Sequence, residues 1–284
     1  MELGGTKTVW AVGDATQAPR EHGEFPTGEP RETLDRALGC IEAVGSVSAV
    51  GVAAFGPIDL ATGTVLQTPK HDWRGAEVLA IVRERVLVPI GLDTDVGAAA
   101  LAEQRLGAAR GLSDCVYLTV GTGIGGGAIV GGSIVHGAGH PEMGHVHVPR
   151  HPRDIEAAFT GVCPYHLDGC LEGLASGPAI AARHGVPAQE LASDDEAWEI
   201  EAHYLAHAVA NLVATLRPQR IILGGGVMSA EGLRGRVQRR LVPLVNPDYI
   251  DVGDGHDYVV APGLGHLSGV TGATLLAEQA LAAS

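Results

Sequence analysis

The sequence has few cysteines and few aromatic residues, and it has no long apolar run. Four cysteines among 284 residues are too few for a disulfide-stapled scaffold, so we expect a reducing, cytoplasmic compartment. No run of about 18 apolar residues is present, so we expect no transmembrane helix. The start of the chain, MELGGTKTVW, lacks a basic region followed by an apolar stretch, so we expect no signal peptide.

Positive charge is scarce as well. The chain carries 19 Lys and Arg residues against 33 Asp and Glu residues, which gives a net charge of −14. Such a surface repels phosphate backbones, so we expect no nucleic-acid partner. The chain does have 45% hydrophobic residues and 41 glycines, with only 4% aromatics, a composition typical of an α/β protein. Its length suits one large domain or two ordinary ones.

Strand and turn signals occur in a pattern that appears twice. Residues 3–13 predict a glycine turn and a strand, and residues 115–135 predict a strand, a glycine turn and a second strand. Helices are predicted within 89–111, 196–218, 220–245 and 267–283. A duplicated α/β unit therefore follows, with an N-terminal lobe over 1–111 and a larger C-terminal lobe over 112–266. The closing helix, 267–284, is a candidate to pack back on the first lobe.

Two of the four cysteines stand seven positions apart in the segment GVCPYHLDGCLEG. In a reducing compartment Cys163 and Cys170 are better explained as zinc thiolates than as a disulfide, and His166 offers a third ligand. Gly169 would allow the tight turn that such a loop needs. The fourth ligand stays open at this point, because four histidines lie upstream: His140, His145, His147 and His151. The alternative is that all these are ordinary surface and core residues.

Three glycine turns are candidates for binding phosphate: Gly4-Gly5-Thr6-Lys7, the turn at 121–127 with Thr122 and Gly123, and Gly224-Gly225-Gly226. Glycine lets successive N–H groups converge on an anion, and a Thr hydroxyl or a Lys ammonium adds to the binding. A Walker loop is absent because Thr6 precedes Lys7. The GxGxxG of 121–126 runs into a predicted strand, which a dinucleotide site does not do. The third turn suits the adenosine end of a nucleotide; the alternative is hairpin chemistry alone.

Eight motifs in order resemble the ROK family of bacterial sugar kinases: ELGGTK, FGPID, DTDVGAAALAE, VGTGIGGG, PEMGH, GVCPYHLDGCLEG, LASGPAI and LGGGV. The Cys-Pro-Tyr-His loop resembles the fructokinase branch. The resemblance implies the two-lobe actin/hexokinase-like (ribonuclease H-like) ATPase fold with a cleft between the lobes. It implies a homodimeric enzyme that uses ATP with Mg²⁺ to make fructose 6-phosphate. The alternatives are a kinase for glucose, mannose or an N-acylated aminosugar, and a sugar-binding regulator without catalysis.

The resemblance also assigns roles to single residues. It implies a structural zinc ion with four protein ligands, His145, Cys163, His166 and Cys170. Asp95, in the first turn of a predicted helix, becomes the general base, and phosphoryl transfer tolerates a weak base because its transition state is loose. The implied sugar-binding residues are Gly56, Pro57, Asp95, Glu142, His145 and Glu172. The implied nucleotide-binding residues are Gly4, Gly5, Thr6, Lys7, Thr122, Gly123, Pro178, Gly224, Gly225 and Gly226.

Each of these assignments has a plainer alternative. Asp95 could merely cap its helix, although Asp93 and Thr94 can already do so. Glu142 and Glu172 could be surface charge. Lys70 and Trp73 could line the mouth of the cleft or could equally be a surface Lys and a packed Trp.

The sequence departs from the family pattern in two places. Gly97 stands where the family has an Asn that helps to hold the sugar. If that Asn bonds a sugar hydroxyl, Gly97→Asn is predicted to lower KM for the hexose, and Asn in the first helical turn is not expected to unfold the protein. The alternative is that a water or a neighbouring side chain already fills the gap, so that Asn gains nothing or clashes. In addition, a family member has several more residues of first strand before Glu2, so we expect a misassigned start codon or a short first strand.

Overall fold

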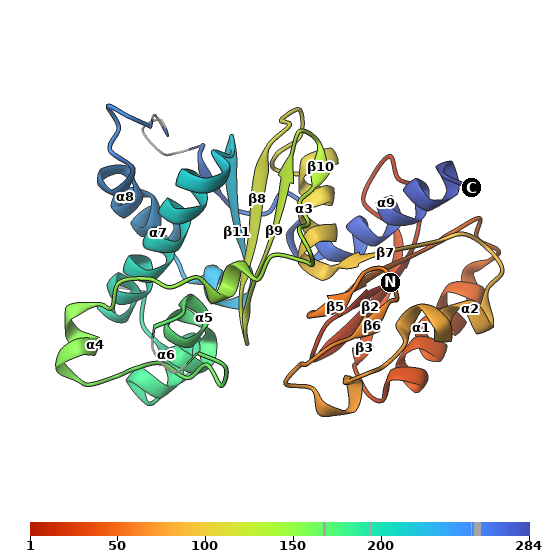
Figure 1. Ribbon diagram of the computed structural model, residues 1–284, viewed down its shortest axis with the longest axis horizontal. Helices are drawn as coiled ribbons and strands as arrows, with labels where there is room; N and C mark the ends of the chain where they lie inside the picture. The colour runs from red at the N-terminus through yellow and green to blue at the C-terminus, as the bar shows by residue number, and fades with distance from the viewer. Residues whose placement is uncertain (167–168, 194, 251, 253–256) are drawn as a thin grey trace. The chain divides into compact units, whose positions relative to one another are not determined.

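The structure is a computed structural model that describes residues 1–166, 169–193, 195–250, 252 and 257–284. Its residues group into two compact units (Figure 1). Unit 1 comprises Met1–Gly111, Ser133–Pro141 and Gly263–Ser284, and unit 2 comprises Leu112–Gly132 and Glu142–Pro262. The expected boundaries placed 133–141 and 263–266 in the second lobe. These residues belong to unit 1 because they contact Asp93 and Glu103, respectively.

The sheet of unit 1 has the strand order β3 (Glu21–Pro26), β2 (Lys7–Val12), β1 (Glu2–Leu3), β4 (Val50–Ala54) and β7 (Ile90–Thr94). β1 pairs antiparallel with β2 and parallel with β4, and β4 pairs parallel with β7. β5 (Ile58–Asp59) and β6 (Thr64–Val65) form an antiparallel hairpin after the Gly56–Pro57 loop.

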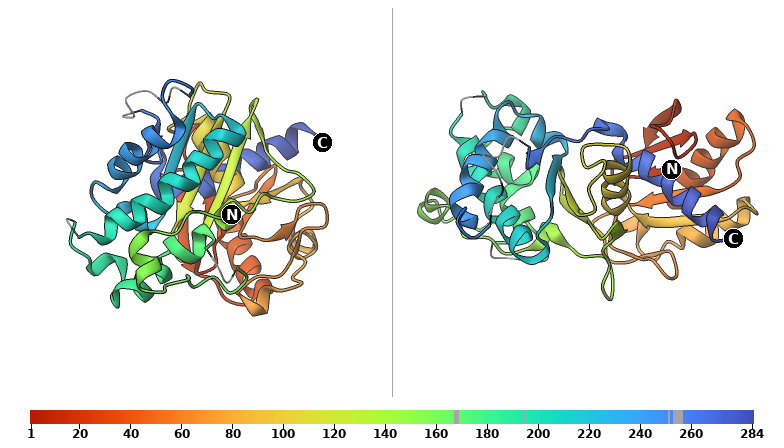
Figure 2. Two further views of the ribbon diagram at one scale, coloured as in Figure 1. Left: turned by 60° about the vertical axis from the view of Figure 1, so that its left-hand side comes forward. Right: turned by 90° about the horizontal axis from the view of Figure 1, so that it is seen from above.

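The two faces of this sheet are covered differently because side chains alternate along each strand. Val50, Val52 and Ala54 of β4 lie in the apolar core beside α1 (Pro30–Val44) and α2 (Val78–Arg85). On the other face, a Cβ at Gly51 would lie 1.7 Å from the carbonyl oxygen of Ala273 in α9 (Ser268–Ala282). Glycine at this position lets α9 pack directly on β4, and α9 can be followed in Figure 2 as the blue helix that ends at the C-terminus. The closing helix thus belongs to unit 1.

The first strand is short. β1 pairs with Thr8 and Val9 of β2 and with Ala53 and Ala54 of β4. Residues 10–12 of β2 and residue 50 of β4 extend beyond this pairing. A cavity of about 420 Å³ lies here, lined in part by Met1, Val12 and Ala277. The amino group of Met1 donates a hydrogen bond to the carbonyl oxygen of Gly51 at 2.6 Å. Burial lowers the pKa of this amino group to about 5.

The sheet of unit 2 repeats the same arrangement. β8 (Cys115–Val120) pairs antiparallel with β9 (Ile124–Val130) and parallel with β11 (Arg220–Gly224), which pairs parallel with β12 (Val259–Val260). Each sheet therefore has an antiparallel hairpin and then two parallel strands, in agreement with the predicted duplication. α7 (Ala197–Leu216) and α8 (Leu233–Val245) pack on each other beside this sheet (Figure 1). The helices and strands predicted within 196–218 and 220–245 are confirmed.

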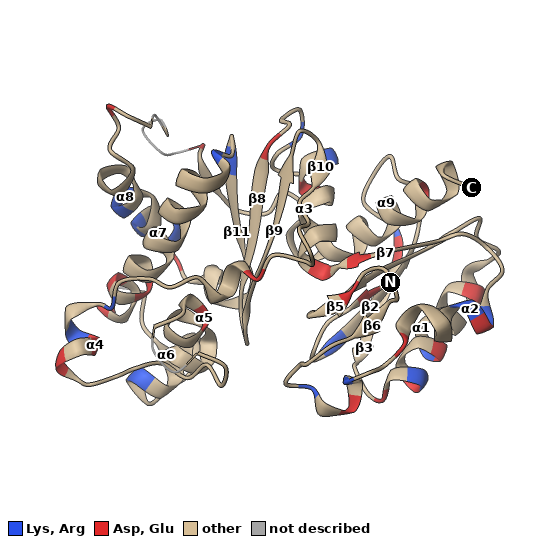
Figure 3. Cartoon of the chain, viewed as in Figure 1, with Lys and Arg blue, Asp and Glu red and all other residues tan. Residues whose placement is uncertain are grey.

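Shorter elements complete the chain. They are β10 (Ser133–Ile134), α3 (Asp95–Arg105), α4 (Pro152–Glu156), α5 (Leu171–Ala175), α6 (Gly177–His184) and five 3-10 turns, η1 (His71–Trp73), η2 (Met143–His145), η3 (Ala188–Glu190), η4 (Gly226–Ser229) and η5 (Gly265–Leu267). Acidic positions occur on elements of both units (Figure 3). Among the described residues, no helix is both long and apolar enough to cross a membrane.

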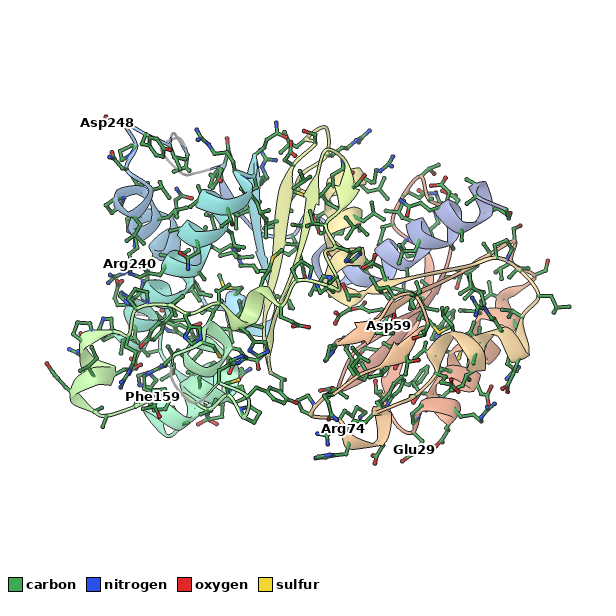
Figure 4. All side chains as sticks on the ribbon, in the orientation of Figure 1. Glu29, Asp59, Arg74, Phe159, Arg240 and Asp248 are labelled. Atoms are coloured by element: carbon green, nitrogen blue, oxygen red, sulfur yellow. The ribbon has the colours of Figure 1, made fainter. Side chains whose placement is uncertain are left out.

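Unit 2 encloses a buried polar network. Arg183 Nε lies 2.9 Å from Asp154 Oδ1, and the hydroxyl of Tyr204 donates to Asp154 Oδ2 at 2.5 Å. The Arg183 guanidinium also lies over the ring of Phe159, which is labelled in Figure 4. Glu201 is buried nearby, and neither of its carboxylate oxygens has a hydrogen-bond partner among the described residues. Burial raises the pKa of Glu201 well above its ordinary value, and Arg183 only partly offsets this.

Candidate active site and metal centre

Four side chains of unit 2 converge with the geometry of a metal site. His145, Cys163, His166 and Cys170 each offer one ligand atom, all within 4.8 Å of one another. Cys163 Sγ lies 3.8 Å from His145 Nδ1 and 3.6 Å from His166 Nδ1, and Cys170 Sγ lies 3.7 Å from His145 Nδ1. A tetrahedral zinc ion, with bonds of about 2.3 Å to S and about 2.0–2.1 Å to N, separates S and N by about 3.6 Å. The donor set and its spacing therefore fit zinc.

The backbone holds this cluster in place by strand-like pairing across the loop. Val148 N donates to Gly169 O at 3.2 Å, and Leu171 N donates to Val146 O at 2.9 Å. Gly169 has φ +88°, so the tight turn expected at this glycine is present. A Cβ at Gly144 would lie 1.7 Å from Ile124 O, so only glycine lets η2 approach β9 and bring His145 to the two cysteines.

The structure selects His145 among the four upstream histidines. His147 is exposed, with its ring centroid 6.2 Å from that of His166. His151 packs against His203 at 5.0 Å, and His140 lies in unit 1. The four cysteines are free thiols, so Cys163 and Cys170 form no disulfide. Burial raises the pKa of Cys170 to about 11, so a bound cation is needed to hold its thiolate form at neutral pH.

Two carboxylates flank the cluster. Burial raises the pKa of Glu142, nearby His145 lowers it, and the negative charge of Glu172 raises it further. Glu172 Oε2 accepts a hydrogen bond from Ile124 N at 2.9 Å. The carboxylate of Glu172 therefore connects the metal loop with the glycine turn between β8 and β9. Glu142 and Glu172 are close enough to interact electrostatically, although Glu142 is exposed.

Three segments of unit 2 that were predicted to bind a nucleotide lie together. Gly177 N, at the start of α6, donates to Gly121 O at 2.8 Å, and a Cβ at Gly177 would lie 3.9 Å from Val227 Cγ2 in η4. Gly225 has φ +90°, and a Cβ there would lie 2.3 Å from Val120 O. The turn holding Thr122 and Gly123, the α6 N-terminus with Pro178, and Gly224–Gly226 thus form one platform. Glycine-rich turns allow an anion to approach the backbone closely at such a place.

In unit 1, Asp95 is the first residue of α3. Thr94 is the N-cap and accepts a hydrogen bond from Gly97 N at 3.0 Å. Asp95 Oδ1 accepts from Val96 N at 2.9 Å. Because Thr94 performs the capping, Asp95 is not required as the cap, and its position at the positive end of the helix dipole favours the carboxylate form.

The space beside Gly97 is already filled. A Cβ at Gly97 would lie 2.4 Å from Asp93 Oδ1 and 2.9 Å from Thr94 Oγ1. Asp93 Oδ1 accepts a hydrogen bond from Thr94 N at 2.7 Å, and Asp93 Oδ2 pairs with His136 Nε2 at 2.9 Å. This crowding favours the alternative in which a neighbouring side chain already fills the gap left by Gly97, and the Asp93 carboxylate must move before Asn is accommodated.

Glu103 was missed by the sequence analysis. It is fully buried in α3, and its carboxylate accepts four hydrogen bonds, from the backbone N of Ala108, Gly263 and Leu264 and from Ser268 Oγ, at 2.6–3.0 Å. It thereby joins α3 to the start of α9. Three of its donors are about 160 residues further along the chain, so no local pattern could have indicated them.

The Gly4–Lys7 turn joins β1 to β2 in unit 1. Thr27 Oγ1 donates to Gly4 O at 2.7 Å, and Lys70 Nζ donates to Thr27 O at 3.1 Å. Lys7 forms an exposed ion pair with Glu24 at 2.6 Å. Lys70 therefore supports the loop beside this turn.

The Gly56–Pro57 peptide, expected to border the sugar, is cis. The residue before it, Phe55, contacts the ring of Trp73 at 5.1 Å. Trp73 is fully buried, and its Nε1 donates to Gly28 O at 2.9 Å. Of the two alternatives for Trp73, the structure supports the packed core residue.

The expected site residues thus fall into two groups. Unit 1 contains Gly4, Gly5, Thr6, Lys7, Gly56, Pro57 and Asp95. Unit 2 contains the Cys/His cluster with Glu142 and Glu172, and the platform formed by Thr122, Gly123, Pro178 and Gly224–Gly226. Glu172 lies between the two sets, because its carboxylate accepts a hydrogen bond from Ile124 N beside the β8–β9 turn.

The similarity to known proteins extends over the whole chain. A family model described as "ROK family" matches residues 1–280. A fructokinase of Zymomonas mobilis subsp. mobilis is 40% identical over 289 residues, which cover 98% of this chain and 95% of that protein. A fructokinase of Streptococcus mutans serotype c is 37% identical over 289 residues, which cover 100% of this chain and 97% of that protein.

Solved structures agree with this relationship. The crystal structure of a ROK family glucokinase from Streptomyces griseus, in complex with glucose and AMPPNP, has a TM-score of 0.76 at 26% identity and covers 98% of both chains. The expected α/β fold of the actin/hexokinase type is thereby confirmed.

Proposed function

Because the chain belongs to the ROK family, we propose that it is an ATP-dependent hexose kinase that prefers fructose and forms fructose 6-phosphate and ADP. The observation that carries the proposal is the full-length similarity to fructokinases. The Cys-x-x-His form of the metal loop, which the sequence shares by resemblance with that branch, supports the same sugar.

The proposed mechanism uses Asp95 as the general base. The 6-hydroxyl oxygen of the sugar attacks the γ-phosphorus of ATP, the bond from that phosphorus to the β–γ bridging oxygen breaks, and ADP leaves. The hydroxyl proton passes to the Asp95 carboxylate. Such transition states are loose, so positioning contributes more than basicity, and a carboxylate at a helix N-terminus is sufficient. Mg²⁺ bound with ATP would neutralise negative charge on the phosphates.

The platform in unit 2 is proposed to hold the nucleotide. The turn at Gly121–Gly123, the start of α6 and Gly224–Gly226 at the carboxyl end of β11 are proposed to lie along the nucleotide, where glycines allow close approach of the phosphates. We also propose that Gly4, Gly5, Thr6 and Lys7 of unit 1 contact phosphate, because this turn combines two glycines, a Thr hydroxyl and a Lys ammonium.

We also propose that His145, Cys163, His166 and Cys170 hold one structural zinc ion. Four protein ligands leave no open position, so this zinc would fix the loop rather than act on substrate. The loop carries Glu142 and Glu172, which are proposed to bind sugar hydroxyls, and the zinc would keep their positions fixed. Elemental analysis of chelator-free protein is expected to give about one zinc per chain; less than half an equivalent would contradict the assignment.

A panel of hexoses tests the proposed activity. ADP release is measured by a coupled assay with ATP and Mg²⁺ for fructose, glucose, mannose and N-acetylmannosamine. We expect the highest kcat/KM with fructose. A higher value for another hexose would refute the proposed substrate, and turnover with none of them, by protein that holds its zinc, would refute the kinase proposal. The homodimer and the cytoplasmic location are proposed from the same resemblance and are tested by sedimentation and by cell fractionation.

A further inference from the structure

A second group of potential metal ligands lies in unit 1, separate from the Cys/His cluster. Asp93 is in β7, and His136 and His140 come from the segment 133–141. One ligand atom from each of the three side chains lies within 4.8 Å of those of the other two. Neither the family resemblance nor the proposed reaction assigns a role to this group.

The backbone brings the two histidines to one carboxylate. Gly137 N donates to Gly139 O at 3.0 Å, and this turn places His136 and His140 with their ring centroids 5.5 Å apart. His136 Nε2 lies 2.9 Å from Asp93 Oδ2, and His140 Nδ1 lies 3.3 Å from Thr94 Oγ1. The three side chains therefore surround a common point at the end of β7.

The spacing is close to that of a loaded metal site. Bonds of about 2.0–2.2 Å from a metal to N or O place two ligand atoms about 3.3–3.6 Å apart at a tetrahedral ion. The three ligand atoms all lie within 4.8 Å of one another, so small rotations of the two imidazoles bring them to this spacing. A metal ion would take the place of the hydrogen bond between Asp93 and His136.

The charge and the burial of Asp93 suit a cation. The residue is 6% exposed, and His136 is its partner among the ion pairs of the described residues. A buried carboxylate without a Lys or Arg partner gains from a bound cation. The His136 side chain is 27% exposed, which gives an ion access from solvent. A side chain at position 97 would collide with the Asp93 carboxylate, so glycine at this position leaves room for the candidate site.

We propose that Asp93, His136 and His140 bind one divalent transition-metal ion such as Zn²⁺ or Co²⁺. Two imidazoles and a carboxylate favour these ions over Mg²⁺, which prefers oxygen ligands, so the site differs from that of the Mg²⁺ bound with ATP. Three protein ligands leave positions open for water, unlike the Cys/His cluster. The ion would join the segment 133–141 to β7, two residues before Asp95.

Cobalt titration tests the proposal on the full-length protein. The chain, freed of metal and of chelator, is first given one equivalent of Zn²⁺, which occupies the thiolate site. Co²⁺ is then added. We expect a second equivalent to bind with visible d–d absorption and without a sulfur-to-cobalt charge-transfer band. His136→Gln and His140→Gln are each expected to weaken this binding about 100-fold or more. Loss of a hydrogen-bond partner outside the ligand shell weakens metal binding only about 10- to 100-fold.

His22→Gln is the matched control. His22 is an exposed histidine on β3 of the same unit, so its loss is expected to leave the second equivalent in place. Circular dichroism checks that each variant is folded, and either histidine variant alone is sufficient. The proposal is overturned if no second equivalent binds, if both histidine variants bind it as tightly as the His22 variant, or if the band shows thiolate charge transfer.

Discussion

Replacing Gly97 by alanine tests whether the start of α3 is built around glycine. The new Cβ would lie 2.4 Å from Asp93 Oδ1, well inside the 3.0 Å that real Cβ atoms essentially never cross. Asp93 cannot turn away freely, because Thr94 N and His136 Nε2 hold its two oxygens. The carboxylate must therefore move and weaken at least one of these hydrogen bonds.

The expected magnitude is the balance of three contributions. Alanine in place of glycine within a helix is favourable by about 0.8–1.0 kcal/mol. Inserting atoms into a packed site costs about 1–3 kcal/mol. A weakened hydrogen bond costs up to about 0.5–1.5 kcal/mol more. We therefore expect Gly97→Ala to lower the free energy of unfolding of unit 1 by about 0.5–3.7 kcal/mol.

Gly39→Ala is the matched control. Gly39 lies inside α1, also in unit 1, and a Cβ there would meet nothing within 4 Å. Only the helix propensity acts at that position, so we expect stabilisation by about 0.8–1.0 kcal/mol. Urea unfolding of the two variants and the parent chain gives both values from the same transition.

The two substitutions are thus expected to have opposite signs. If Gly97→Ala stabilised the protein as much as Gly39→Ala, the close approach of Asp93 would be unimportant and the reasoning would be refuted. For Gly97→Asn, the same crowding makes us expect a higher KM for fructose, in place of the lower KM that the sequence alone predicted. A lower KM would show that the site adapts to the amide.

Three further changes test the interior and the metal loop. Cys170→Ser is expected to lower zinc affinity by at least about tenfold, measured by competition with a chelator; unchanged affinity would remove Cys170 from the proposed ligands. Glu103→Gln places amide N–H groups beside four donors, so it is expected to lower the free energy of unfolding, measured with urea, by about 1–3 kcal/mol. An unchanged free energy of unfolding would show that the charge is not needed. Glu201→Leu is expected to stabilise the protein more at pH 8 than at pH 5. Burial raises the pKa of the Glu201 carboxyl in the folded chain above its ordinary 4.5. The parent chain therefore loses stability as the pH rises from 4.5 toward the raised pKa. An equal difference in free energy of unfolding at the two pH values would contradict a titrating Glu201.

Local patterns in the sequence were sufficient to predict several of the regular elements. The alternation and glycines of 115–135 indicated the β8–β9 hairpin, and the apolar spacing of 196–218 indicated α7, because both signals depend only on neighbouring residues. The cysteine spacing also indicated that Cys163, His166 and Cys170 lie close together, as the structure has them.

The remaining site features depend on contacts between distant segments. Spacing left four histidines open as the proposed fourth ligand. In the structure His145 lies beside the two cysteines, while the pairing of 146–148 with 169–171 leaves His147 exposed. The role of Glu103 depends on donors far along the chain. Gly97 appeared to leave a gap in the sugar pocket, but the side chain of Asp93, four residues earlier, fills that space. No residue pattern in one dimension shows such a contact.

The turnover of Asp95→Asn tests the central claim most directly. Asn keeps the size of the side chain but cannot accept the proton of the sugar hydroxyl. With ATP, Mg²⁺ and fructose, kcat is expected to fall by about 10²–10⁴, the usual contribution of a general base, while KM for fructose changes little. Asp72→Asn, which changes an exposed carboxylate on η1, is expected to keep the parent kcat. A kcat for Asp95→Asn equal to that of the parent enzyme would contradict the account and would leave Asp95 as no more than the first residue of α3.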